Sequence, residues 1–292
     1  MFPGHHFYSV PTKAEVASNP ESFPYPGFTG NTLTDASERT PPEAALELVS
    51  RAAQEALGDR RRRAADLVVV VDDVELQNAE QPARIVSVMR RAVEEHLGQI
   101  HQTRHLDKTR DLLCAKVSFH LIAPMIESWF FADSRALERA GVQGAEHAVL
   151  NDKTDPEAFK TTDPGYLAAT ELDCPALAAL PAHRKKKLRP KWLGTLPRGR
   201  YPKGYLQWLC RVPADRTCTS YSETSDGGAA LAQIRWESLF SRPPDHFGLL
   251  RALVDDLEDG LGCAPAMGRV DGEVSPLTAR SLAPQDAVLR NI

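Results

Sequence analysis

Three carboxylates directly follow the most β-prone run of the sequence. Leu67–Val71 is an unalternating apolar run, and Asp72, Asp73 and Glu75 come after it. Such a run is typical of a strand buried on both faces of a parallel sheet, and ligands gather at the carboxyl ends of parallel strands. Oxygen ligands of this kind suit Mg²⁺ or Mn²⁺. An acidic turn that only caps the following loop would explain the same residues equally well.

A second group of polar residues interrupts the apolar stretch SFHLIAPMIESWFFADSRAL. It contains Ser118, His120, Glu127 and Asp133. We interpret His120 as a hydrogen-bonded core histidine. Glu127 opens a segment rich in aromatic residues, where a buried carboxylate requires a partner. It is therefore a candidate site residue, although a carboxylate at a helix N-terminus could also be stabilised by the helix dipole.

A basic segment, residues 184–203, contains nine Lys or Arg residues interrupted by three prolines. We predict that it is mobile and exposed and, if it binds nucleic acid, grips phosphates. A solvated loop is the alternative. The candidates for nucleic-acid contact are Lys185, Lys186, Lys187, Arg189, Lys191, Arg198 and Arg200.

Helices and strands alternate around these residues. Helical periodicity and stop signals predict helices at 41–57 and 82–97, and a second strand at 116–125 precedes a helix at 127–137. The fold class that follows is α/β, with a central, mainly parallel sheet, helices on both faces and strand 67–71 in its interior. Three further helices are expected at 203–209, 228–240 and 247–261, followed by a loop or tail.

We predict four segments along the chain: an extended arm (1–40) whose Phe28 packs onto the body with Phe23 and Tyr25, an α/β domain (41–180), a basic linker (181–204), and a helical part (205–292) packed on the same body.

Composition excludes several classes of protein. The chain has 292 residues, 42% hydrophobic and 25% charged, with a net charge of -4, which argues against wholesale disorder and against a cationic nucleic-acid binder. It has no apolar run long enough to span a membrane. The five scattered cysteines lack CxxC spacing, so we expect reduced thiols in a cytoplasm rather than disulfides or a zinc site.

Four stretches together carry a family resemblance: the apolar strand ending in an acidic pair, IAPMIESWFFADSRAL, YPKGYL and YSETSDGGAALAQIRW. Over roughly residues 66–260 the chain resembles an uncharacterised bacterial family related to the Toprim domain. That family is similar to the Toprim part of overcoming-lysogenization-defect nucleases and is often associated with ABC-type ATPases in phage defence. The resemblance implies a Toprim-like fold and a Mg²⁺-dependent nuclease. Asp73 and Glu75 would occupy the Asp-x-Asp positions, with Asp72 as an alternative ligand. Because Lys203 lies within the resembling motif PKGYL, we expect it to point inward, where its counterpart could neutralise a phosphate or pair with a site carboxylate.

One motif of the Toprim family is not matched. Its N-terminal strand leading into Glu-Gly-x-Thr-Glu is not visible, and the nearest stretch offers only Glu15. Either the arm supplies an altered version, or Glu127 substitutes, or the chain keeps the fold without the reaction. A P-loop is also absent, so any ATP hydrolysis must come from a partner.

The sequence therefore leaves several functions open. The first is a metal-dependent hydrolase acting on DNA or RNA, with Asp73, Glu75, Glu127 and Lys203 as catalytic candidates and Asp72, Asp73 and Glu75 as metal ligands. The second is a module of the same fold that binds nucleic acid or protein without catalysis. The third is a subunit held and released by an ATPase.

Overall fold

The computed structural model describes residues 4–10, 27–58, 63–144, 148–179, 197–211, 218–263 and 287–292, together with Phe2, Pro181 and Leu193. These residues form two compact units. Unit 1 comprises residues 1–122 and 249–292, and unit 2 comprises residues 123–248. These boundaries differ from the four predicted segments, because the chain leaves unit 1 at the end of its second strand and returns to it with the last helix.

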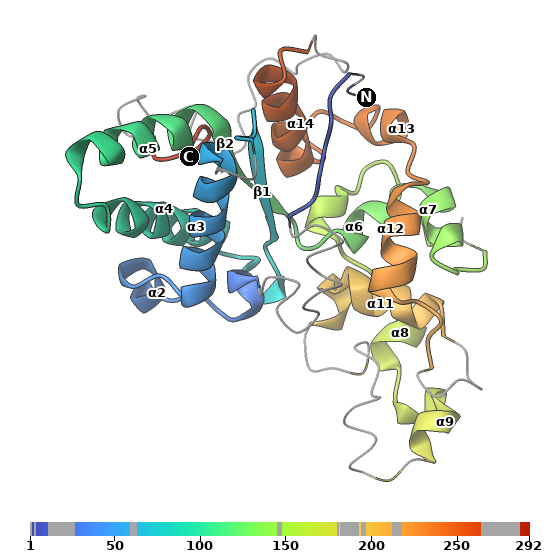
Figure 1. Ribbon diagram of the computed structural model, residues 1–292. Helices are drawn as coiled ribbons and strands as arrows, with labels where there is room; N and C mark the ends of the chain where they lie inside the picture. Colours follow the sequence, from blue (N-terminus) through green and yellow to red (C-terminus); the bar gives the residue numbers. More distant parts are fainter. Residues whose placement is uncertain are drawn as a thin grey trace. The chain divides into compact units, whose positions relative to one another are not determined.

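Unit 1 contains a parallel pair of strands, β1 (Val68–Asp73) and β2 (Val117–Ile122) (Figure 1). Val70 lies opposite Phe119 in the register. All six residues of β2 are buried, whereas Val71 of β1 is 42% exposed. Within the described residues the sheet has only these two strands. The prediction that strand 67–71 lies in the sheet interior is therefore wrong, and the strand buried on both faces is β2.

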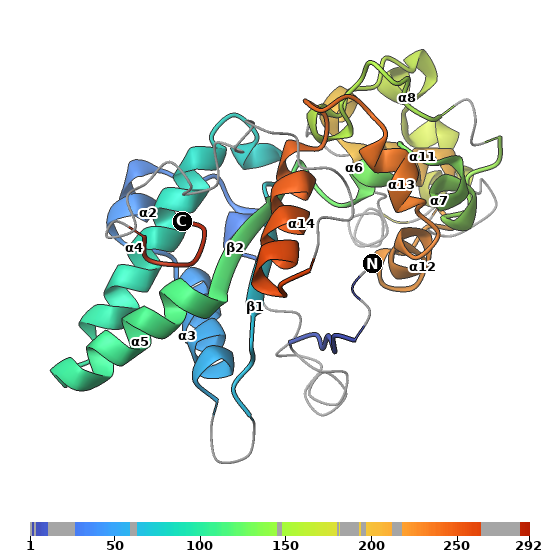
Figure 2. The same cartoon turned by 90° about the horizontal axis from the view of Figure 1, so that it is seen from above.

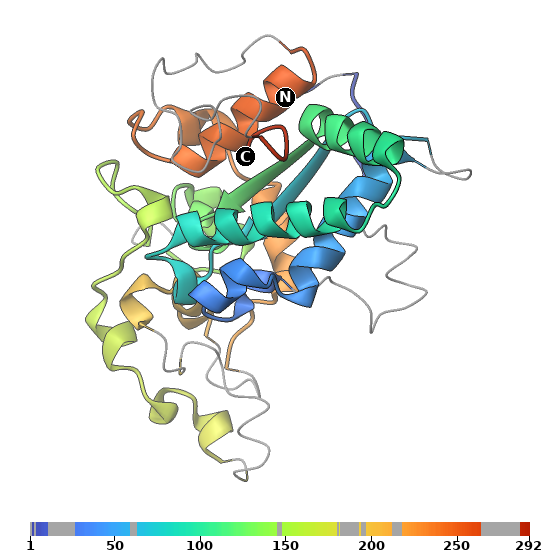
Figure 3. The same ribbon diagram turned by 90° about the vertical axis from the view of Figure 1, so that its left-hand side faces the viewer.

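Helices cover both faces of this pair. The pocket-lining residues Val49 of α3, Met89 of α4 and Leu113 of α5 meet Val70 and Val117 on one face. Figure 3 views the strands from this helical side. On the other face His120 of β2 reaches Asp256 of α14, and Figure 2 shows α14 beside β2. The α/β class and the helices on both faces are thus confirmed for the described chain.

Amphipathic patterns are found in α3, α4 and α14 of unit 1, but not in α2 and α5. The helix α2, which buries no residue, lies within the arm 1–40, so the prediction that this arm is extended is wrong at residues 35–39. Alanine and aliphatic residues line the buried side of α3, and Gly58, with φ 67°, ends it as predicted. The helix α5 was not predicted, because its polar sequence TRHLDKTRDLLCAK buries only Thr109 and Leu113. The helices are α2 (Asp35–Arg39), α3 (Glu43–Leu57), α4 (Pro82–Gly98), α5 (Thr103–Lys116) and α14 (Gly248–Gly260).

The end of the predicted arm packs against the strands of unit 1. Phe28 is buried, and its ring lies 6.2 Å from that of Phe119. The buried amide of Asn78 accepts from the Leu33 backbone and donates to the Thr29 carbonyl, which anchors the same segment. The expected packing of Phe28 is confirmed, whereas Phe23 and Tyr25 lie outside the described residues.

Residues 287–292 were expected to be a loop or tail, yet they complete the free edge of β2. The Asn291 side chain accepts from the Phe119 backbone N–H at 2.8 Å and donates to the Phe119 carbonyl at 2.7 Å. The Arg290 backbone donates to the Val117 carbonyl. Leu289 and Ile292 are buried. A buried strand edge must satisfy its backbone groups, and here the end of the chain does so.

Unit 2 is built from short helices joined by side-chain hydrogen bonds. The guanidinium of Arg242 donates to the carbonyls of Leu150, Asn151 and Thr154. The predicted helices 127–137 and 228–240 are each divided into two. The helices are α6 (Glu127–Phe130), α7 (Ser134–Arg139), α8 (Pro164–Ala168), α9 (Pro175–Ala178), α11 (Pro202–Leu209), α12 (Gly228–Leu231) and α13 (Trp236–Phe240).

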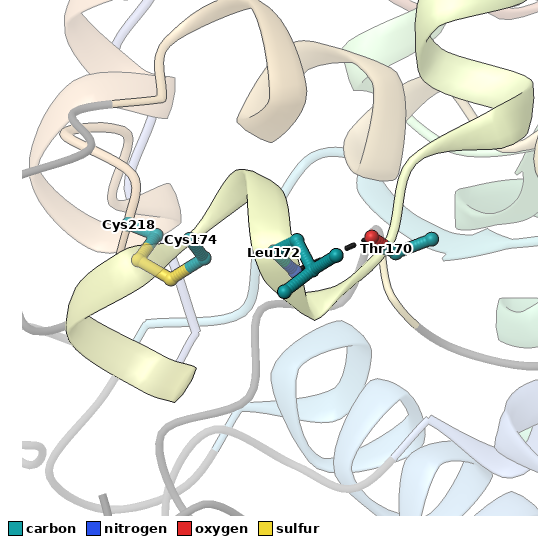
Figure 4. The surroundings of a disulfide bond; sticks show 4 residues. All are labelled: Thr170, Leu172, Cys174 and Cys218. Carbon is teal, nitrogen blue, oxygen red and sulfur yellow. Dashed lines mark hydrogen bonds between the residues drawn. A yellow bond between two sulfur atoms is a disulfide. The ribbon is translucent and has the colours of Figure 1, made fainter. Parts of the chain in front are cut away.

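A disulfide joins Cys174, the residue before α9, to Cys218, with their Cα atoms 5.6 Å apart (Figure 4). The prediction that all cysteines are reduced is therefore wrong for these two, because sequence spacing could not show that residues separated by 44 positions meet in space. Cross-linking a loop of this length stabilises a fold by about 4 kcal/mol in the chain-entropy model. Cys114, Cys210 and Cys263 are free.

The contact of Asn291 with β2 leads to a stability prediction. Asn291→Ala leaves the N–H and the carbonyl of Phe119 unpaired in a buried place, and we expect unfolding to require about 2–4 kcal/mol less free energy. Chemical denaturation of the full chain measures this value. Asn31→Ala, at an exposed position, is the control and should change stability by less than about 0.5 kcal/mol. Equal effects of the two substitutions would show that the tail does not complete the strand.

Candidate functional site

The sequence-predicted site residues are divided between the two units. Asp72, Asp73 and Glu75 belong to unit 1, and Glu127 and Lys203 belong to unit 2. We describe each group within its own unit.

The acidic group lies where β1 ends. Asp72 and Asp73 are its last two positions, and Glu75 follows with a positive φ of 60°. Asp72 Oδ1 accepts a hydrogen bond from the Asp73 N–H at 2.9 Å. A Cβ atom at Gly27 would lie only 2.9 Å from Asp72 Oδ1, so glycine allows the arm to pack directly on this carboxylate. The acidic residues therefore sit at the strand end, as predicted.

Burial raises the pKa of Asp72 from 3.8 to about 6. The neighbouring charge of Glu75 contributes to this rise, and hydrogen bonds from the Asp73 and Phe28 backbones and from the Thr29 side chain partly oppose it. Its Oδ2 atom is buried and forms no hydrogen bond within the described chain. Asp72 is thus a carboxylate whose negative charge is poorly compensated.

The same strand end does not hold three convergent metal ligands. In the ranges that the structure describes, no group of three or more His, Cys, Asp and Glu side chains is arranged to hold a metal ion. Mg²⁺ commonly uses only one or two protein carboxylates, with water and phosphate as its other ligands. The buried, unbonded oxygen of Asp72 fits that simpler arrangement and not a complete protein cage.

His120 belongs to a buried network of unit 1. Its Nε2 lies 3.2 Å from Asp256 Oδ2, and Arg290 Nε donates to Asp256 Oδ1 at 2.9 Å. Burial alone would raise the pKa of Asp256, but hydrogen bonds from His120, Ser118 and Arg290 outweigh it and lower the pKa to about 2. The interpretation of His120 as a core histidine is confirmed. The network joins β2, α14 and the end of the chain.

Unit 2 contains a buried ion pair between two of the predicted residues. Lys203, at the start of α11, is 9% exposed, and its Nζ lies 3.8 Å from Oε1 of Glu127, which is 1% exposed. Burial raises the pKa of Glu127, and the charge of Lys203 partly opposes that rise. The expectation that Lys203 points inward to a carboxylate is confirmed.

Two residues that were not predicted complete this cluster. The Tyr221 hydroxyl donates to Glu127 Oε1 at 3.2 Å, and Lys203 Nζ also donates to Glu223. Glu223 opens a π-helical turn, Glu223–Gly227, a conformation that is common at functional sites. Both residues lie in YSETSDGG, so the signal was present in the sequence, but the type of residue alone did not distinguish them from surface polar residues.

Asp133 has a structural role. Its side chain accepts from the backbone N–H of Arg135 at the start of α7, and from the backbone and Nε of Arg235. Burial would raise the pKa of Asp133, but these hydrogen bonds hold it below its usual value. A carboxylate so fully bonded has no capacity left for a ligand.

Most of the basic segment lies outside the described residues, including Lys185, Lys186, Lys187, Arg189 and Lys191. Of the rest, Arg198 donates to the carbonyls of Tyr166, Leu167 and Ala169, so it caps α8. Arg200 is exposed. Buried Pro202 and Lys203 begin α11, so the predicted exposed segment ends before them.

In the described residues, no helix has the length and apolar character needed to cross a membrane. Comparison with known protein families, with curated protein sequences and with solved structures finds no match. The functional argument therefore depends on the site geometry and on the sequence resemblance.

Because of the hydrogen bonds to Asp256, we expect the free energy of unfolding to depend on pH in the acid range. Because the folded-state pKa is depressed to about 2 from 3.8, the stabilisation is present above about pH 4 and is lost as the pH falls toward 2. Asp256→Asn should lower the unfolding free energy at pH 7 by about 2 kcal/mol and flatten the dependence between pH 2 and 4. Denaturant titrations across this range test this prediction. The Asn variant of the half-buried neighbour Asp255 is the control and should behave like the parent.

The Glu127–Lys203 ion pair leads to a second prediction about stability. Lys203→Met leaves a buried carboxylate without its cation and should destabilise the chain by about 3–5 kcal/mol. Because the pKa of Glu127 then rises further, the loss should be larger at pH 8 than at pH 5. Glu127→Gln in the same chain should recover part of the loss, giving a coupling of about 1–3 kcal/mol in a double-mutant cycle.

The control for this cycle is Lys153→Met, at an exposed position of the same unit. It should change stability by about 0.5 kcal/mol or less. Strict additivity of Lys203→Met and Glu127→Gln would contradict the pairing.

Proposed function

We propose that the chain is a Toprim-like protein that binds Mg²⁺ or Mn²⁺ at the carboxyl end of β1 and acts on phosphodiesters as a nuclease. The observation that carries this proposal is Asp72, a carboxylate at a parallel strand end with one buried oxygen lacking a hydrogen bond and a pKa raised to about 6. A carboxylate in this condition gains stability from a cation, because a cation lowers the cost of its charge.

Asp72 would hold the cation, with Asp73 or Glu75 as a second ligand. The bound ion would supply Lewis acidity to a phosphoryl oxygen. The chain itself positions the ligands: the parallel pairing of β1 with β2 fixes Asp72 and Asp73, and the close packing of Gly27 on Asp72 limits water access on one side.

The wider setting of the proposal comes from the resemblance alone. It comprises a phage-defence assembly and an ABC-type ATPase partner. The proposed cytoplasmic location rests instead on the scattered cysteines, and the basic segment would hold DNA or RNA through its positive charge. A disulfide such as Cys174–Cys218 is rare in reducing cytosol, so its state in the cell bears directly on the compartment.

A second candidate is a non-catalytic module of the same fold that binds nucleic acid or protein. It is favoured by the packing of the arm on Asp72. The contacts of this carboxylate with Gly27, Phe28 and Thr29 would give it a structural role. The unmatched N-terminal glutamate motif points the same way.

Divalent cations distinguish the two candidates. Melting temperatures of the full chain are measured in chelator, in Mg²⁺ and in Mn²⁺, together with cleavage of single- and double-stranded DNA and RNA. A cation at a hundred times its Kd should stabilise the parent by about 2.7 kcal/mol, and Asp72→Asn and Asp73→Asn should lose both this gain and cleavage.

The matched control is Asp66→Asn, an exposed carboxylate just before β1, which should respond to cations like the parent. In chelator, Asp72→Asn should be more stable than the parent at pH 7, by up to about 3 kcal/mol. The variant is more stable because a carboxyl group whose pKa is raised in the folded state destabilises the parent as the pH rises from about 4 to about 6. A parent chain indifferent to both cations would replace the nuclease proposal with the binding module.

A further inference from the structure

One segment of unit 2 closes over the Glu127–Lys203 pair. We call residues 218–227 the cover segment. It supplies the Tyr221 hydroxyl to Glu127 and the Glu223 carboxylate to Lys203. Tyr221 is buried, whereas the Glu223 side chain is 59% exposed and lies on the solvent side of the pair. The two buried charges are therefore separated from solvent in part by side chains of this segment.

The cover segment is held at its beginning by two sets of bonds. Ser220 donates from its backbone N–H and from its hydroxyl to the Cys210 carbonyl at the end of α11. Cys218, two positions earlier, is bonded through sulfur to Cys174 (Figure 4). Cys174 and Cys218 are both fully buried.

The disulfide is placed where it can control this closure. The loop that the disulfide closes, from Cys174 to Cys218, includes α11 and therefore Lys203. Cys218 has a positive φ of 53° and leads directly into the cover segment. The cross-link thus fixes the point from which Tyr221 and Glu223 reach the ion pair, and the remaining ties are hydrogen bonds and an ion pair that water can replace.

We propose that the Cys174–Cys218 disulfide is a redox control that keeps the cover segment closed over Lys203 and Glu127. A dithiol reductant transfers two electrons and two protons, the S–S bond breaks, two thiols form, and the dithiol becomes a disulfide. The start of the cover segment then loses its covalent tie to Cys174 and is held by noncovalent contacts such as the Ser220 bonds, so local opening becomes more frequent. Opening exposes the Lys203 ammonium and the Glu127 carboxylate to solvent and to ligands.

This control does not depend on the proposed cation site. It concerns residues of unit 2 only, and its readout is the accessibility of Lys203 rather than cleavage. The proposed function can therefore fail while the redox control holds, and the reverse is equally possible.

The test is amine labelling of the full-length chain with an acetylating reagent, followed by peptide mass spectrometry. The oxidised protein, unfolded without reductant, should show three thiols, from Cys114, Cys210 and Cys263. Reduction with dithiothreitol should raise the labelling rate of Lys203 roughly tenfold and leave that of exposed Lys153 unchanged. Reoxidation should restore the slow rate.

Matched variants isolate the bond. In the double variant Cys174→Ser, Cys218→Ser, Lys203 should be labelled at the fast rate without reductant, and dithiothreitol should not change that rate. The control Cys114→Ser should respond to dithiothreitol like the parent. If the double variant does not fold, reduction and reoxidation of the parent still decide the outcome.

Three results would overturn the proposal. The first is five free thiols in the oxidised protein. The second is a Lys203 labelling rate that does not change when Cys174 and Cys218 are reduced. The third is loss of the near-ultraviolet circular dichroism on reduction, because unfolding of the unit would then account for the exposure.

Discussion

The complete burial of β2 is the constraint on which unit 1 depends. A strand with one neighbour has a free edge, and buried backbone groups at that edge must find partners. β1 satisfies one side, and Asn291 and Arg290 satisfy the other. The face toward α14 carries the polar side chains of Ser118 and His120, and buried His120 pairs with Asp256. This requirement explains why a unit that begins at the N-terminus also needs the last helix and the last six residues.

The described residues of unit 2 form no sheet, and their backbone groups find partners in another way. The helices of this unit are short, with α11 the longest at eight residues, and short helices leave many terminal backbone groups unpaired. Charged side chains take up these groups: Asp163 caps α8 at its start, Arg198 binds carbonyls at its end, and Arg242 binds three carbonyls of the 150–154 loop. Among the buried charged residues described in this unit, Asp133 and Arg242 thus bond backbone groups. Lys203 differs, because it pairs with the carboxylates of Glu127 and Glu223.

The sequence predicted those features that depend on local pattern. The amphipathic periods of α3 and α4, the β-branched run of β1 and the inward position of Lys203 are all confirmed. It failed where the outcome depends on distant partners. The Val68–Val71 run lies at an edge because no further described strand pairs with it, and α5 is helical although it buries little. The Cys174–Cys218 bond and the roles of Tyr221 and Glu223 required knowledge of which distant segments meet.

Four carboxylates of the candidate sites differ in how their charge is compensated, and this difference ranks them as ligand sites: Asp72, Glu127, Asp133 and Asp256. Arg235 and two backbone N–H groups hold the pKa of Asp133 low, and His120, Ser118 and Arg290 do the same for Asp256. Burial raises the pKa of Glu127, but its carboxylate already pairs with Lys203 and accepts a hydrogen bond from Tyr221. Asp72 has a raised pKa with no basic side chain among the described residues that lowers it. A cation is opposed least where protein cations do not already pair with the carboxylate, so among these four Asp72 is the one that suits the proposed cation site best.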